Sequence, residues 1–144
     1  MVGIPVLRMS QVIRRPVKDV FEAVIHVERF PEWNPRNPSA RRLSEGAIAQ
    51  GASFELEIKG FGKVRQTLEE FERDARVRIV PHMRALEGGH RFVFTAQGGQ
   101  TRIDHELEMR PQGAFRLMTP MMWLVGKKNL RETARHLQRH LEGP

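Results

Sequence analysis

The most constraining feature of this 144-residue chain is that its hydrophobic period changes twice along its length. Apolar residues recur at helical spacing near the start and again near the end. Between these segments they alternate with polar residues, as in half-buried strands. We therefore expect an α+β fold in which helices cover one face of a largely antiparallel sheet. The length fits a single domain over residues 1–144.

The first helical segment follows a strand, and we expect residues 9–13 to form the end of that strand. Pro16 opens the helix, where a missing backbone N–H costs nothing. The apolar positions that follow at i, i+3, i+4, i+7 and i+8 spacing are Val17, Val20, Phe21, Val24 and Ile25. Residues 27–34 are predicted to add a short second helix. Three prolines, Pro31, Pro35 and Pro38, then predict a stiff loop up to residue 39 that contains Trp33.

The strands of the central region are predicted from alternation and turn residues. We expect strands at 54–58, from 63 onward, around 77–79, at 92–96 and at 103–109. A break in parity near Glu69 or Glu70 predicts a β-bulge. Gly88-Gly89 is expected to lead into the fourth of these strands, and Gly98-Gly99 to turn the chain into the fifth. Every connection is expected to be a hairpin between sequence neighbours, in a curved sheet of about seven strands.

The final helical segment carries an apolar stripe of Leu130, Ala134, Leu137 and Leu141. This spacing predicts a long helix of roughly 21 residues, or about 30 Å, that lies across the sheet. Thr119 is expected to cap its main part, with residues 114–118 as a kinked or separate first turn. Trp123 is expected to pack in the interface of this helix.

A bent sheet that meets a long helix at both ends encloses a space between them, and the inward side chains predict what lines it. Methionine suits such a wall because it adapts to irregular space. The apolar candidates for ligand contact are Phe54, Leu56, Val64, Val77, Ile79, Phe92, Phe94, Leu107, Met118, Met121 and Met122.

Three further side chains are candidates for contact with a ligand. His105 shares a face with Ile103 and Leu107, so it is either a hydrogen-bonding or proton-transferring group in the pocket or a structural histidine bonded to a carbonyl. Gln66 allows the same two interpretations. Trp33 is either a core anchor for the proline loop or a lid over the pocket.

Other patterns favour structural roles. Asp104, Glu106 and Glu108 share the outer strand face and should point into water, where a general acid gains no raised pKa. Glu132, His136 and His140 form a helical stripe, but their spacing is not that of a known zinc motif, so we expect no metal. The glycines match no nucleotide-binding loop, and we expect no cofactor.

Composition narrows the partners and the compartment. The chain has a net charge of +7 and no cysteine. We consider nucleic-acid binding unlikely because the arginines are scattered among acids and lack interleaved aromatics. The longest apolar run is far short of a membrane span, and no signal peptide is recognised, so we expect cytoplasmic residence. Either a monomer or a homodimer fits the sequence.

A family resemblance rests on the first quarter of the chain. Ile13, Pro16, Val20-Phe21 and the run Glu28-Arg29-Phe30-Pro31-Glu32-Trp33 resemble the START-like, birch-pollen-allergen-like superfamily, especially its polyketide cyclase/dehydrase branch (SRPBCC). The resemblance implies a helix-grip fold around a cavity for an apolar or amphipathic small molecule that is polyketide-, lipid- or isoprenoid-like. The family shares this cavity but not one reaction.

The resemblance leaves three functions open. The first is ligand binding without chemistry. The second is a cyclase/aromatase-like or dehydratase-like enzyme in which His105, alone or together with Gln66, orients and enolises a poly-keto substrate. The third follows coenzyme-Q-binding and ribosome-associated relatives, and combines a quinone or lipid ligand with a basic surface for ribosomes or membranes.

Overall fold

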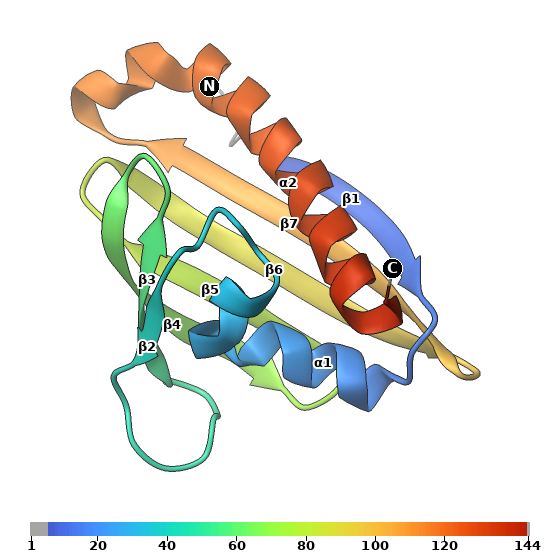
Figure 1. The fold of residues 1–144 in the computed structure, drawn as a ribbon. Coiled ribbons are helices and arrows are strands. Elements are labelled where there is room, and N and C mark those ends of the chain that lie inside the picture. Colours follow the sequence, from blue (N-terminus) through green and yellow to red (C-terminus); the bar gives the residue numbers. More distant parts are fainter. Residues whose placement is uncertain (1–5, 144) are drawn as a thin grey trace.

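The protein is described by a computed structural model in which residues 6–143 are placed. A seven-stranded antiparallel sheet curves around one long helix, which confirms the predicted α+β architecture (Figure 1). The elements along the chain are β1 (Val6–Ile13), α1 (Val17–Ile25), η1 (Val27–Glu32), β2 (Ala40–Arg42), β3 (Ser53–Ile58), β4 (Gly62–Glu72), β5 (Arg76–His82), β6 (Leu86–Gln97), β7 (Gln100–Pro111), η2 (Gly113–Met118) and α2 (Thr119–Glu142). The short helices η1 and η2 are 3₁₀ helices.

The sheet order is β1-β7-β6-β5-β4-β3-β2, so the expectation that every strand pairs with its sequence neighbour is wrong at one place. β1 pairs with β7, from Val6 opposite Glu108 to Ile13 opposite Thr101. The reason is the connection over residues 14–39, whose helices α1 and η1 carry the chain from one edge of the sheet to the other. The short edge strand β2 was not predicted, because three residues after a proline loop give no alternation to detect.

Two irregularities shape the strands. The register of β4 against β5 shifts between Glu69 and Glu72, and Glu70 has a positive φ of 49°, which confirms the predicted bulge. The predicted start of the fourth of the central strands at residue 92 is too late, since β6 begins at Leu86 and includes Gly88 and Gly89. A Cβ on Gly88 would collide with the backbone carbonyl of Glu108, so glycine is required there for the close approach of β7.

Helix α2 lies across the concave face of the sheet, as its apolar stripe predicts (Figure 1). Leu130, Ala134 and Leu137 are buried. The separate first turn is confirmed as η2, but the predicted cap is wrong: Thr119 is the first helical residue, and its hydroxyl donates to the carbonyl of Arg116. Trp123 also departs from its predicted packing role, because its ring is 37% exposed beneath the Lys127 ammonium.

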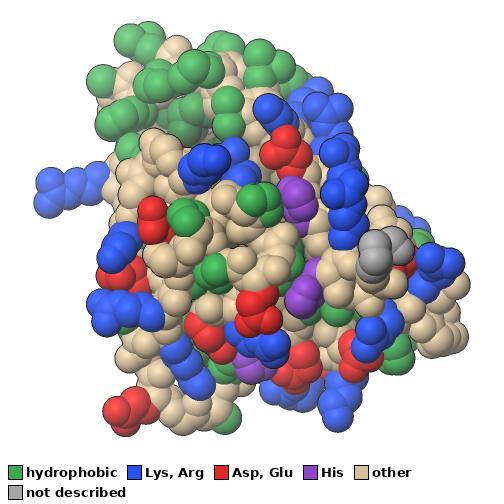
Figure 2. Space-filling view, viewed as in Figure 1, with side chains coloured by type: hydrophobic (Ala, Val, Ile, Leu, Met, Phe, Trp, Pro, Cys, Tyr) green, Lys and Arg blue, Asp and Glu red, His purple; other side chains and the backbone are tan. Residues whose placement is uncertain are grey.

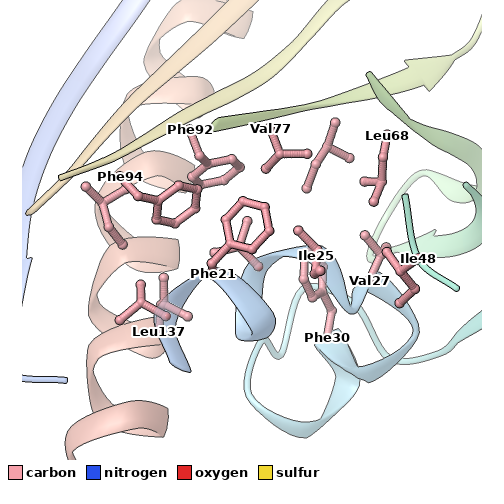
Figure 3. Packing of buried hydrophobic residues seen from close by; sticks show 14 of the residues in the cluster. Phe21, Ile25, Val27, Phe30, Ile48, Leu68, Val77, Phe92, Phe94 and Leu137 are labelled. Atoms are coloured by element: carbon pink, nitrogen blue, oxygen red, sulfur yellow. The ribbon is translucent and has the colours of Figure 1, made fainter. Parts of the chain in front are cut away.

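The main core fills the space between α1, η1, the sheet and the C-terminal half of α2. Phe92 and Phe94 of β6 point toward Phe21 of α1, with Leu137 contributed by α2 (Figure 3). The ring of Phe21 makes edge-to-face contacts with the rings of Phe94 and Phe71, with centroids 5.1 Å and 5.5 Å apart. Bulky residues on helical spacing in α1 thus form a close-packed end of the molecule.

The outer face of the sheet is a charged layer, as its parity predicts. Glu106 forms ion pairs with Arg8 and Arg91, and Glu108 with Arg78 and Arg110. Much of the basic charge is therefore balanced locally by acids on neighbouring strands. No helix in the described residues is long and apolar enough to cross a membrane.

Candidate functional site

The site is a cavity with two connected chambers between the sheet and α2. An outer chamber of about 500 Å³ lies beneath η2 and the first turns of α2. An inner chamber of about 100 Å³ continues toward the core, between Leu56, Ile79, Phe92 and Leu137. The two chambers share five lining residues, which we call the neck: Arg36, Ile58, Gln66, His90 and Asn129.

The outer chamber is open because little fills the space on that side of the molecule. Helices α1 and η1 lie near the C-terminal end of α2, whereas η2 and the first turns of α2 lie at the opposite end (Figure 1). Gly88 and Gly89 line the chamber and contribute no side chains to it. The surrounding apolar side chains include Phe115, Met118 and Met122.

Polar groups gather at the neck. Gln66 is buried although it carries an amide. The Thr133 hydroxyl donates to Oδ1 of Asn129 at 3.1 Å, so the amide nitrogen of Asn129 remains to donate elsewhere. Among the ion pairs of residues 6–143, none involves Arg36. The neck therefore offers one guanidinium and two amides to a polar group inside an otherwise apolar cavity.

His90 of the neck is paired with a second histidine, His105, which lines neither chamber. Nδ1 of His90 and Nε2 of His105 lie 2.9 Å apart, so one imidazole donates to the other. The ring of His105 also stacks on Phe92, with centroids 4.1 Å apart. Burial lowers the pKa of His90 to about 4, and burial together with neighbouring His90 lowers the pKa of His105 well below its ordinary value. Both rings are therefore neutral at pH 7, and the proton on the shared bond decides whether His90 donates to the cavity or accepts from it.

The structure brings many of the predicted ligand-contact residues to the two chambers. Those that line the inner chamber are Trp33, Leu56, Gln66, Ile79 and Phe92. Those that line the outer chamber are Gln66, Leu107, Met118, Met121 and Met122.

The other predicted residues do not line either chamber. Phe54, Val77 and Phe94 belong to the solid core, and Val64 is buried outside the chambers. His105 is also absent from the walls: it contacts His90, and His90 is the histidine that lines the neck. Inward parity alone cannot separate a wall from a filled core, because helix α1 covers part of the same concave face.

His90 is the functional candidate that the sequence analysis missed. It has the inward parity of Phe92 and Phe94, so alternation alone would have found it. The sequence analysis started this strand at residue 92 and so left His90 out, whereas β6 begins at Leu86. Arg36 and Asn129 gave no comparable signal, since one lies in a proline loop and the other on a helix flank.

Trp33 combines parts of both predicted roles. It packs edge-on against Phe30, with ring centroids 5.0 Å apart, and joins the core cluster. On its other side it stacks against His140 of α2 at 6.3 Å. Trp33 therefore anchors the loop and forms a wall of the inner chamber.

The helical stripe of Glu132, His136 and His140, from which no metal site is expected, makes other contacts. Glu132 lies 3.9 Å from Lys128, and His140 stacks on Trp33. Within residues 6–143, no three His, Cys, Asp or Glu side chains are grouped so as to hold a metal ion.

Solved structures with the same fold come from several sources. A START superfamily protein from Mycobacterium smegmatis superposes with a TM-score of 0.78 at 15% identity, over 95% of this chain and 97% of the other. The Zhui aromatase/cyclase from Streptomyces sp. R1128 superposes with a TM-score of 0.80 at 12% identity, over 97% of this chain and 94% of the other. Norcoclaurine synthase from Thalictrum flavum superposes with a TM-score of 0.75 at 9% identity, over 99% of this chain and 96% of the other. The comparison with curated proteins found no match.

A family model described as polyketide cyclase / dehydrase and lipid transport matches residues 5–142. That match covers nearly the whole chain, and it agrees with the cavity beneath α2 and with the shared fold. The chain therefore belongs to the polyketide cyclase/dehydrase and lipid transport family.

Proposed function

We propose that this protein binds one amphipathic small molecule, with its apolar part in the outer chamber and its polar end at the neck. The observation that carries this proposal is the arrangement of an apolar chamber of about 500 Å³ that ends in Arg36, Gln66, His90 and Asn129. Ligand pockets in proteins commonly combine mostly apolar walls with a few convergent polar groups.

The chemistry of the walls indicates the class of ligand. Flexible methionines suit a guest of irregular shape, such as a polyketide-, lipid- or isoprenoid-like molecule. At the neck, Arg36 would attract a carboxylate or an enolate, while the amides and the neutral His90 would hydrogen-bond a carbonyl or a hydroxyl. The family description, which names both cyclases and lipid transport, supports the same range.

A pair of probes with equal tails tests this proposal. Decanoate and decanol would each displace a fluorescent anilinonaphthalene sulfonate from the cavity at one molecule per chain. Met122→Trp, which fills the outer chamber, is expected to weaken both probes at least about tenfold, since loss of a buried apolar contact costs more than about 1.4 kcal/mol. Leu124→Trp is the matched control, because this residue lies on the same helix but does not line the chamber.

The polar end is tested separately. Arg36→Gln should weaken decanoate about tenfold or more and leave decanol unchanged, because a hydrogen bond to a charged group contributes about 1.5–3 kcal/mol. Equal binding of both probes to wild type and Met122→Trp would contradict the proposal.

The second candidate function is a cyclase-like reaction, and the His90–His105 pair favours it. In such a reaction His90 would exchange a proton with a poly-keto substrate, while His105 would set the tautomer of His90 through their 2.9 Å contact. His90→Ala should then lower turnover of a linear poly-β-ketone about a hundredfold or more, with a smaller loss for His105→Ala. Wild-type turnover in both variants would leave ligand binding as the function.

A further inference from the structure

One end of the molecule exposes large apolar side chains that the cavity does not account for. Seven of the eleven exposed large hydrophobic residues lie in the short stretch 115–125, and Phe61 of the β3–β4 turn is another. Figure 2 shows hydrophobic side chains gathered over η2 and the start of α2. We call this surface the apolar end: Phe61, Phe115, Leu117, Met118, Met121, Trp123, Leu124 and Val125.

The apolar end surrounds the mouth of the outer chamber. Phe115, Met118, Met121 and Val125 line that chamber and are also 40–52% exposed. Leu117 and Leu124 do not line it, although they are 88% and 65% exposed. The latter two leucines therefore serve neither the core nor the chamber, and concentrated exposure of this kind marks an interaction surface.

Within the segment that carries most of the apolar end, the charged side chains have one sign. Residues 112–131 include Arg116, Lys127, Lys128 and Arg131 but no Asp or Glu. Lys127 lies over the Trp123 ring at 3.9 Å, and Lys128 reaches Glu132, which lies just beyond this segment, at 3.9 Å. On the outer sheet face, by contrast, arginines alternate with acids and pair with them.

The combination of apolar side chains and nearby cations indicates which partner covers the apolar end. If a second copy of the chain covered the apolar end symmetrically, it would bring the same cations against each other without any acid from residues 112–131. An anionic lipid surface instead accepts apolar side chains below its headgroups and cations at the headgroup level. We propose that the apolar end docks on the surface of an anionic lipid bilayer, with the mouth of the outer chamber facing the lipid.

Vesicle co-sedimentation tests this docking. The full chain should bind vesicles made of equal parts phosphatidylcholine and phosphatidylglycerol, and bind pure phosphatidylcholine vesicles far more weakly. Leu117→Asp combined with Leu124→Asp should reduce the binding more than about tenfold, since it opposes both the apolar and the electrostatic contributions. Leu43→Asp is the matched control, because Leu43 is an exposed leucine (39%) in the loop after β2.

The electrostatic part has its own variant. Arg116→Gln combined with Lys127→Gln should weaken binding about thirtyfold at low salt, because each cation near an anionic surface raises affinity roughly fivefold. Raising sodium chloride from about 50 mM to about 500 mM should also weaken vesicle binding by the wild type, because salt screens the same attraction.

Two results would overturn the docking proposal. One is vesicle binding that does not change in the paired leucine variant. The other is absence of vesicle binding together with a dimer, detected by light scattering, that the leucine variant dissociates. Decanoate titration of the same proteins keeps this test separate from the proposed ligand binding, because Leu117 and Leu124 lie outside the chamber walls.

Discussion

The two halves of α2 cover interiors of opposite character. Under the C-terminal half, Leu137 joins Phe21, Val24 and Phe94 in the main core, which leaves space for the small inner chamber of about 100 Å³. Under the N-terminal half, the residues toward the sheet surround an open chamber, and the smaller cluster of Leu7, Leu107, Met109 and Leu130 lies at its edge. One continuous helix therefore stabilises the fold at one end and bounds the candidate site at the other.

The difference lies in what fills the concave face of the sheet. At the closed end, α1 inserts Phe21, which is fully buried, between the sheet and α2. At the open end, β6 presents Gly88 and Gly89 toward the chamber, and within residues 6–143 no helix corresponding to α1 fills that space. Hollow space in this fold thus depends on where the connection between the first two strands crosses the sheet.

The largest expected effect compares one substitution from each half. Phe21→Ala removes a fully buried ring with two aromatic contacts, so it should lower the free energy of unfolding by about 3–5 kcal/mol. Met121→Ala, at a half-exposed wall position, should cost less than about 1 kcal/mol. Urea denaturation measures the loss of unfolding free energy in both variants. Similar losses would contradict the distinction between a packed half and an open half.

A second pair of substitutions compares Gly88, which lines the outer chamber, with Gly98, which does not. Gly88 has φ 136° and its added Cβ would meet the Glu108 carbonyl, so Gly88→Ala should cost about 3 kcal/mol or more. Gly98 has φ 66° with nothing within 4 Å of an added Cβ, so Gly98→Ala should cost about 1 kcal/mol. Thermal unfolding of the two variants separates backbone strain from the close approach of β7, and an equal loss in both would contradict the assigned role of Gly88.

The histidine pair predicts how stability changes with pH. In the unfolded chain a histidine has a pKa near about 6.5, whereas the pKa of His90 is about 4 when folded and that of His105 is also lowered. The unfolded state therefore takes up protons first as the pH falls below about 6.5. Each histidine should then remove up to about 1.4 kcal/mol from the free energy of unfolding per pH unit, until its folded-state pKa is reached.

His105→Gln should make this pH dependence shallower, since it leaves one buried histidine in place of two and keeps a hydrogen-bonding partner for His90. Urea denaturation at several pH values from about 5 to about 7 measures the slope in a range above the ordinary carboxylate pKa. A slope unchanged from the wild type would show that His105 is not kept neutral by burial.

The sequence predicts the fold better than it predicts the site. Helical spacing placed α1 and the buried face of α2, and alternation placed β3 to β7, because both signals are local. The pairing of β1 with β7 depends on a long connection and leaves no local trace. Parity also identified the inward face, yet Val77 and Phe94 on that face pack in the core while Ile79 and Phe92 line a chamber.

The neck shows the same limit in chemical terms. His90 could have been assigned from strand parity, but its 2.9 Å contact with His105 depends on the register of β6 against β7. Arg36, in a loop, and Asn129, on α2, meet Gln66 only through the tertiary fold. Such polar convergence of distant segments has no sequence period that would reveal it.

The most direct test of an open half beside a solid half uses the methionine methyl groups. Met83, Met109, Met118, Met121 and Met122 line the outer chamber, whereas Met9 of β1 does not. In NMR spectra of the protein with isotopically labelled methionine methyls, saturating decanoate should shift the signals of these five residues and leave Met9 in place. Shifts spread equally over Met9 and the chamber methionines, or no shifts at all, would contradict a ligand-accessible chamber beneath the start of α2.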